Sequence, residues 1–286
     1  MTIPSYLCHY TSQEGLIGII NYKKLWMTNI LYLNDSTEFT YTLKLIKSEA
    51  VSRKIRIADS HPKRAIPIPP LIGDERKNAS YSMIIRTIEE VETERFLNLY
   101  VFSLSEKAND LNQWRGYCPR SGGYCIVFNT SKLKSSLAHS GKEYDFKLCI
   151  YNEEEQISII KSLFDNLDQE IDKNPDSDYL KILSQHLAIM SSQAPFIKHD
   201  SFQNEHEWRI VTHQDETIMF RAGISTITPY CELNILDDNN SVPITKIIIG
   251  PTPHKELARN SVKILLEKNH LDYVDVEFSN HPYRTW

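Results

Sequence analysis

The segment Glu205-His206-Glu207 carries the residues best suited to acid–base chemistry. It stands at the start of an apolar stretch predicted to form a strand, 207–213. In an extended chain, residues two apart point to the same face, so Glu205 and Glu207 would share a face with Arg209. Two close carboxylates repel each other, which raises the pKa of one of them. Such a pair suits reactions of a glycosidic bond, where a carboxylate stabilises an oxocarbenium-like centre. Arg209 could instead pair with Glu207 in a structural role.

A second polar group, Cys8-His9-Tyr10-Thr11-Ser12, stands where the first predicted strand leads into a helix. His9, Tyr10 and Thr11 could hold a polar ligand at this junction. The alternative is a hydrogen-bonded core histidine followed by Ser12 as the helix cap. Neighbouring strand residues point to opposite faces, so Cys8 and His9 are not expected to form a nucleophilic pair.

Two serines and two aromatic residues form a third group. Ser103 and Ser105 share one face of the strand predicted at 99–105. Hydroxyls on a buried face need partners, and a ligand could supply them. Trp114 and Tyr117 lie three residues apart on a short predicted helix, and therefore on one helical face. Their rings could stack on a ligand or pack in the core, and the sequence leaves both readings open.

The segment after the second predicted strand could cap a helix or contact a ligand. Asp35 and Glu38 have the spacing of a capping box. Asn34, beside them, could point toward a ligand near the first strand. Its amide is therefore a candidate contact.

A basic stretch follows, in which residues 44–64 contain seven basic and two acidic side chains. Such a run is usually a solvated helix face. Next to a site it could bind phosphates, including those of a nucleic-acid backbone. The candidate contacts are Arg53, Lys54 and Arg56.

Motifs for metals and common cofactors give no further site. His199, Asp200 and Glu205 could ligate a metal, but their spacing has no specificity, and we expect no metal. The sequence contains no G-x-x-x-x-G-K-[ST], G-x-G-x-x-G, G-x-S-x-G or H-E-x-x-H. No motif in the sequence therefore supports a P-loop NTPase, a dinucleotide-binding fold or a serine hydrolase.

The composition bounds the class of protein. The 286 residues are 41% hydrophobic and carry a net charge of −5, which argues against a globally basic nucleic-acid binder and against wholesale disorder. Five cysteines with no C-x-x-C pair argue against a disulfide framework and a thiolate zinc site, and they favour a reducing compartment. No signal peptide or membrane-length apolar run is visible, so we expect a soluble cytoplasmic protein.

The elements that must position these groups are strands and helices in irregular alternation. This pattern favours the α+β class over a doubly wound sheet. Four prolines between residues 59 and 74 predict a loop, and residues 153–193 read as a helical insertion. No linker is evident, so the sequence predicts one domain over 1–286. The predicted strands are 5–11, 25–29, 99–105, 122–129, 146–152, 207–213, 232–236, 245–250 and 272–278.

The order of these motifs resembles the bacterial DUF2971 family. The sequence reads HYTS, LW, LND-x-x-E, VFSLS, W-R-G-Y, G-Y-C-I-V-F and F-x-x-E-x-E-W-R between Leu7 and Arg209. A late IIIGP and a closing S-x-x-P-Y-R also fit. That family more distantly resembles the ADP-ribosyltransferase fold, which implies a split mixed β-sheet core and NAD⁺ as a substrate.

The resemblance assigns roles to the candidate residues. Glu207 would bind the ribose 2′-hydroxyl and stabilise the oxocarbenium-like ribose, while Glu205 would orient or deprotonate the acceptor. The resemblance also implies further NAD⁺ contacts. His9 and Thr11 would hold a ribose or the nicotinamide amide, and Tyr10, Trp114 or Tyr117 would stack on the nicotinamide ring. Arg115 or Arg209 would meet the pyrophosphate, and Asn34 and Ser103 would lie nearby.

The resemblance also implies an acceptor and a biological setting. We expect transfer to a macromolecule, with RNA or DNA favoured over protein by the basic stretch. An enzyme that modifies macromolecules of its own cell must be restrained, which implies a toxin or an anti-phage effector with a neutralising antitoxin partner. The alternatives are an NAD⁺ glycohydrolase, a non-catalytic module that senses a nucleotide or phage component, and a metal-dependent nuclease.

Overall fold

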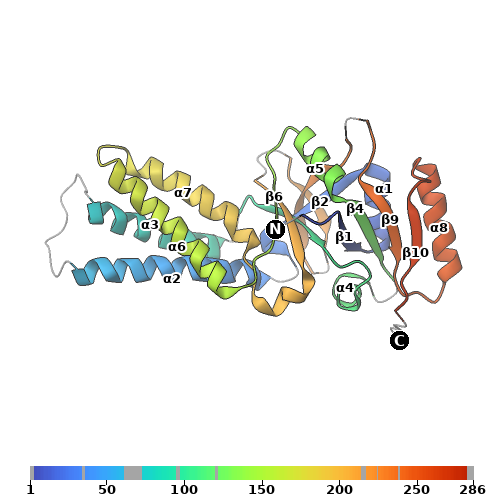
Figure 1. Ribbon diagram of the computed structural model, residues 1–286, viewed down its shortest axis with the longest axis horizontal. Coiled ribbons are helices and arrows are strands. Elements are labelled where there is room, and N and C mark those ends of the chain that lie inside the picture. Colours follow the sequence, from blue (N-terminus) through green and yellow to red (C-terminus); the bar gives the residue numbers. More distant parts are fainter. Residues whose placement is uncertain are drawn as a thin grey trace. The chain divides into compact units, whose positions relative to one another are not determined.

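The computed structural model describes residues 3–33, 36–60, 73–94, 97–119, 122–213, 217–223, 225–237 and 239–281 (Figure 1). The chain divides into two compact units. The sheet unit comprises Met1–Thr28, Leu99–Leu148 and Asn204–Trp286, and the helical unit comprises Asn29–Asn98 and Cys149–Gln203. The sequence predicted one domain with a helical insertion. In the structure that insertion shares a compact unit with the two long helices of the N-terminal third.

The elements follow the chain in this order. The strands of the sheet unit are β1 (Tyr6–Thr11), β2 (Lys24–Asn29), β3 (Tyr100–Ser105), β4 (Tyr124–Asn129), β5 (Asp145–Leu148), β6 (Glu207–Thr212), β7 (Met219–Ala222), β8 (Ile227–Asn234), β9 (Ile244–Ile249) and β10 (Asp275–Phe278). Its α-helices are α1 (Gln13–Tyr22), α4 (Leu111–Tyr117), α5 (Thr130–His139) and α8 (Lys255–Lys268). The helical unit contains α2 (Ser36–Ser60), α3 (Gly73–Glu94), α6 (Glu153–Lys173) and α7 (Tyr179–Gln193), with short 3₁₀ turns η1 (Ile30–Tyr32) and η2 (Ala194–Phe196). A third turn, η3 (Asp200–Glu205), leads into β6.

Local signals placed most of these elements correctly. Ser12 caps α1, and its hydroxyl accepts a hydrogen bond from the Gly15 amide at 3.2 Å. Two elements were not predicted: α5, and β7, a four-residue strand at the end of the sheet. The core of the predicted proline-rich loop, 61–72, lies outside the residues that the structure describes, as does the Asn34–Asp35 pair.

The ten strands in the described part of the chain form one mixed sheet, which confirms the α+β class. The strand order is β10-β9-β4-β1-β3-β2-β8-β7, and β6 pairs with β3 and with β5. β9 and β10 are parallel, whereas β1–β3, β1–β4, β4–β9, β3–β6, β5–β6, β2–β8 and β7–β8 are antiparallel. Figure 1 shows α8 lying along β10.

The sheet splits between β1 and β3. These two strands register at a single pair, Cys8 opposite Ser105. In contrast, β1 pairs with β4 over its whole length, and β3 pairs with β6 over its whole length. Beyond the Cys8–Ser105 pair, the described residues give no further pairing between β1 and β3, and β3 has β2 as its next neighbour in the strand order.

Apolar side chains cover both faces of the sheet, as the residues of β9 show. Ile247 and Ile249 belong to the large cluster that includes Leu7 and Phe102, whereas Ile248 packs on the other face. The smaller cluster on that face contains Cys8, Tyr10, Trp114, Cys125, Val127 and Ile248. Alternate residues of one strand thus serve two apolar layers.

In the helical unit, α2, α3, α6 and α7 pack against one another (Figure 1). The described part of the basic stretch, residues 44–60, lies on α2, and its most buried member is Arg53. The Arg53 guanidinium contacts Glu49 at 2.7 Å, Asp165 at 2.6 Å and Asp168 at 2.6 Å. These contacts do not support the prediction that Arg53 binds a phosphate, because three carboxylates already occupy its donors.

The remaining bulk features concern membranes and cysteines. No helix in the described part of the chain is long and apolar enough to cross a membrane. All five cysteines are free thiols, and all but Cys118 are buried.

Candidate functional site

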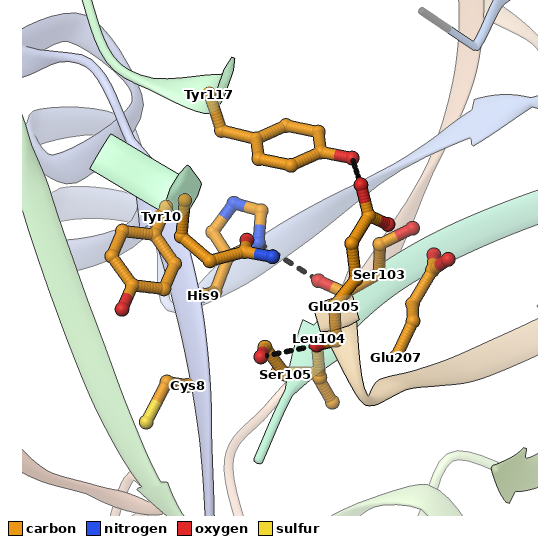
Figure 2. Close-up of a pocket in the computed structure, with 10 residues that line it drawn as sticks. Cys8, His9, Tyr10, Ser103, Leu104, Ser105, Tyr117, Glu205 and Glu207 are labelled. Carbon is orange, nitrogen blue, oxygen red and sulfur yellow. Dashed lines mark hydrogen bonds between the residues drawn. The ribbon is translucent and has the colours of Figure 1, made fainter. Parts of the chain in front are cut away.

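A pocket opens at the split between β1 and β3, and every residue that lines it belongs to the sheet unit. The empty space within it is about 340 Å³, which includes open solvent. The pocket is therefore a small hollow that suits one ring or sugar more than a whole dinucleotide. The lining residues are Cys8, His9, Tyr10, Ser103, Leu104, Ser105, Gln113, Tyr117, Glu205 and Glu207 (Figure 2).

The ring of His9 spans the split. Its Nδ1 donates a hydrogen bond to the Ser103 carbonyl at 3.0 Å, and the ring packs on Phe102 with centroids 4.3 Å apart. Burial is the main reason why the pKa of His9 is lowered to about 4. The nearby charge of Arg221 contributes to this lowering, and the hydrogen bond to Ser103 opposes it. His9 is therefore neutral at pH 7. With its proton on Nδ1, Nε2 is left as a hydrogen-bond acceptor.

Both glutamates line the pocket, but the backbone between them does not have the extended conformation considered from the sequence. Glu205 ends η3 and Glu207 begins β6, so no strand carries both. His206, between them, has a φ of 44°, in the left-handed region. The expectation of an extended Glu205–Glu207 segment is therefore wrong. Figure 2 shows that both side chains nevertheless lie on one side of the pocket.

The end of β3 fixes this turn. The Ser105 hydroxyl donates to the Glu205 carbonyl at 2.7 Å, and the Glu106 amide donates to the His206 carbonyl at 3.2 Å. The Glu106 carboxylate accepts a hydrogen bond from the Trp208 indole at 2.8 Å. Ser105 thus finds its partners within the chain. Ser103 forms no side-chain hydrogen bond among the described residues, and its hydroxyl lines the pocket.

Glu207 is held by Arg209. Both residues are buried, at 5% and 3% exposure. Arg209 Nε donates to Glu207 Oε1 at 2.8 Å and Nη2 donates to Oε2 at 2.9 Å, which is a bidentate pair. The structural reading of Arg209 is confirmed. Its predicted role at a pyrophosphate has no support, because the donors named here serve Glu207.

Glu205 is positioned from α4. The Tyr117 hydroxyl donates to Glu205 Oε1 at 2.8 Å, and Tyr117 is 40% exposed (Figure 2). A phenol at the mouth of the pocket therefore orients one of its two carboxylates. Of the aromatic residues predicted to stack on a ligand, Tyr117 has the most exposed ring.

Tyr10 and Trp114 instead anchor α4. The Tyr10 hydroxyl donates to the Lys107 carbonyl at 2.7 Å and accepts from the Asp110 amide at 2.8 Å. Its ring meets the Trp114 ring edge-on at 4.8 Å, and Trp114 is 3% exposed. A Cβ on Gly250 would lie 2.8 Å from the Trp114 ring. The prediction that Trp114 stacks on a ligand is wrong, because core contacts enclose it.

The other predicted contacts do not line the pocket. The Thr11 hydroxyl packs against α1, where a Cβ on Gly15 would lie 1.9 Å from its oxygen. Arg115 is exposed on α4. Lys54 and Arg56 lie on α2 in the helical unit, and Arg56 contacts Glu49 at 3.2 Å.

Sequence reasoning missed two residues that bear on the pocket. Gln113 lines it from α4 and is 6% exposed. Arg221, on β7, donates to the Thr28 hydroxyl at 2.8 Å and lies over the rings of Trp26 and Tyr230. Neither stands in a recognisable motif, and Arg221 lies on a strand that the pattern did not reveal.

A comparison with protein families bears on this region. Residues 113–210 match the DUF2971 model. That model is described as a protein of unknown function. The DUF2971 match runs from α4 to β6, so it includes Gln113, Tyr117, Glu205 and Glu207 but not His9. The expected DUF2971 resemblance is supported over this segment.

Two further comparisons were negative. No curated protein and no solved structure gives a significant match. Within the described ranges, no group of three or more His, Cys, Asp or Glu side chains is arranged to hold a metal ion.

Proposed function

We propose that the protein is an NAD⁺-dependent ADP-ribosyltransferase whose pocket receives the nicotinamide–ribose end of NAD⁺. The observation that carries this proposal is the charge of the pocket. Its lining contains two carboxylates, Glu205 and Glu207, and no lysine or arginine among the described residues. Arg209, which lies outside the lining, pairs with Glu207 and offsets its charge, so the two carboxylates do not add up to two full negative charges. The one titratable base, His9, is neutral at pH 7 because burial lowers its pKa to about 4.

Such a lining favours a ligand that is cationic or becomes cationic. The nicotinamide ring of NAD⁺ carries a positive charge, and cleavage of its glycosidic bond moves that charge to the ribose. A fixed carboxylate is worth more in a partly water-excluded site than in water. Glu207, held by two hydrogen bonds from Arg209, is the preorganised group for this role.

The proposed reaction balances as follows. The bond between nicotinamide N1 and ribose C1′ breaks, and its electron pair leaves with nicotinamide. An acceptor nucleophile then bonds to C1′ and loses a proton to Glu205, which Tyr117 orients at 2.8 Å. The products are nicotinamide, the ADP-ribosylated acceptor and a proton. The acceptor is proposed to be a macromolecule. The basic stretch favoured nucleic acid, and the pairing of Arg53 with three carboxylates weakens that preference.

The test uses NAD⁺ labelled on its adenylate phosphate, incubated with the protein and separately with total bacterial protein, RNA and DNA. Glu207→Gln is the test variant, and Glu277→Gln, an exposed carboxylate on β10, is the matched control. Tyr117→Phe is a second variant that leaves the Glu207–Arg209 pair intact.

The outcomes separate the candidate functions. Labelling of one pool by the wild-type protein and by Glu277→Gln, but not by Glu207→Gln, would support transfer and identify the acceptor class. Free nicotinamide without labelled macromolecule would favour an NAD⁺ glycohydrolase. Neither product from the folded protein would contradict the proposal.

A further inference from the structure

Gln113 presents its side-chain amide to the pocket. The residue as a whole is 6% exposed and lines the pocket from α4. Its backbone amide donates to Asp110, but its side-chain amide makes no hydrogen bond within the described part of the chain. The amide is therefore available to a ligand, and a few polar groups placed in this way fix the orientation of a ligand in its pocket.

The surroundings hold Gln113 in place. Asp110 caps α4 by accepting from the amides of Asn112 at 2.8 Å and Gln113 at 3.2 Å. Tyr10 fixes the Asp110 backbone, and the Trp114 indole donates to Asn109 at 3.1 Å. The carboxamide is therefore presented by a rigid frame rather than by a mobile surface turn, which is the arrangement that a specific ligand contact requires.

We propose that Gln113 recognises the carboxamide of nicotinamide through two paired N–H···O hydrogen bonds, and that it excludes nicotinic acid. This inference rests on the proposed function. A primary amide offers one acceptor and two donors, which match those of another primary amide. A carboxylate in the same place would accept but not donate, so it would leave the Gln113 oxygen unpaired.

The charges of the pocket point the same way. Glu205 repels an anionic ring substituent, whereas Arg209 offsets the charge of Glu207, so a nicotinate meets both repulsion and a lost hydrogen bond. The edge of adenine also offers a donor beside an acceptor. However, adenine is neutral, whereas the nicotinamide ring of NAD⁺ is cationic and suits the two carboxylates better.

The test is a ligand-observed NMR titration of the intact protein with three small probes: 1-methylnicotinamide, whose ring carries the same positive charge as in NAD⁺, 1-methylnicotinate and adenine. None of them is consumed by the proposed reaction. Gln113→Met keeps the volume of the side chain and removes both polar groups. Asn112→Ala, at the exposed neighbouring position on α4, is the matched control.

We expect the wild-type protein to bind 1-methylnicotinamide at least about tenfold more tightly than 1-methylnicotinate, as one hydrogen bond near a charge would give. Gln113→Met should lose most of this ratio, and Asn112→Ala should keep it. An unchanged ratio in folded Gln113→Met, or adenine binding more tightly than 1-methylnicotinamide, would overturn the inference.

The labelled NAD⁺ assay makes the two proposals separable. If the protein transfers ADP-ribose but its ratio of affinities for the amide and acid probes does not depend on Gln113, the proposed function is supported and the role of Gln113 is rejected. Gln113-dependent binding of 1-methylnicotinamide without NAD⁺ cleavage would support the role of Gln113 and reject the transferase.

Discussion

Glu205 and Glu207 line one pocket although the residue between them adopts a left-handed conformation. His206 has a φ of 44°, which ends η3 at Glu205 and starts β6 at Glu207. Hydrogen bonds from Ser105 and Glu106 to the carbonyls of Glu205 and His206 hold the turn in place. The placement of the two carboxylates therefore depends on backbone geometry rather than on strand alternation.

This geometry makes His206 sensitive to the shape of its replacement. Glycine adopts a positive φ without steric cost, so His206→Gly should leave the free energy of unfolding within about 1 kcal/mol of wild type. His206→Val should cost ~1–3 kcal/mol, because a β-branched residue is strained there. Urea denaturation measures both, with His206→Asn as a control that tolerates the conformation. Equal stability of the Val and Gly variants would contradict the interpretation.

The buried pair of Glu207 and Arg209 should show strong coupling. Removing one partner leaves the other charge buried, so Glu207→Leu or Arg209→Met alone should each cost ~3–5 kcal/mol. The double variant should cost clearly less than the sum of the two, since it leaves neither charge behind.

A double-mutant cycle by urea denaturation tests this coupling. The exposed pair Lys246–Glu277, at 2.6 Å, provides the control cycle, and its coupling should be ~0–1 kcal/mol. Strictly additive losses at Glu207 and Arg209 would show that the two charges do not depend on each other.

Local sequence signals could place most elements but not the pocket. The alternation of β3 and the Ser12 cap are local patterns, and both match the structure. The pairing of β3 with β6 along its length, and with β1 at one point, is a tertiary choice that no local period encodes. The sequence therefore selected His9, Ser103, Glu205 and Glu207 as candidates, but it could not show that a split in the sheet brings them together.

The same reason explains the errors within α4. The sequence shows which residues share a helical face, but not which face is buried. Trp114 enters the core because Gly250 leaves room for its ring, and Gln113 lines the pocket together with Tyr117. Both facts depend on contacts with distant strands. They could not be read from the spacing of Trp114 and Tyr117.

His9 predicts a pH dependence of stability. Its pKa in the folded protein is about 4, below its ordinary value of 6.5. Between these values the unfolded chain takes up a proton that the folded chain does not, so the His9 contribution to the free energy of unfolding should fall as pH decreases from 6.5 to 4. The slope should approach ~1.4 kcal/mol per pH unit.

Two variants isolate this effect in urea denaturation across that pH range. His9→Gln should remove the His9 contribution. Arg221→Met should raise the pKa of His9 in an NMR titration, because the Arg221 charge lowers it. A slope that is unchanged in His9→Gln would assign the pH dependence to other groups.

Arg53 separates a structural role of the basic stretch from a binding role. Its guanidinium is 10% exposed and contacts three carboxylates, those of Glu49, Asp165 and Asp168. Arg53→Met should lower the free energy of unfolding by ~3–5 kcal/mol, because it leaves these carboxylates close together without their cation. Lys54→Met, on the same helix, should change it by no more than ~0.5 kcal/mol. Urea denaturation and a nucleic-acid binding assay would be run on both variants. If Arg53→Met kept full stability and lost binding of nucleic acid, Arg53 would be a phosphate contact after all.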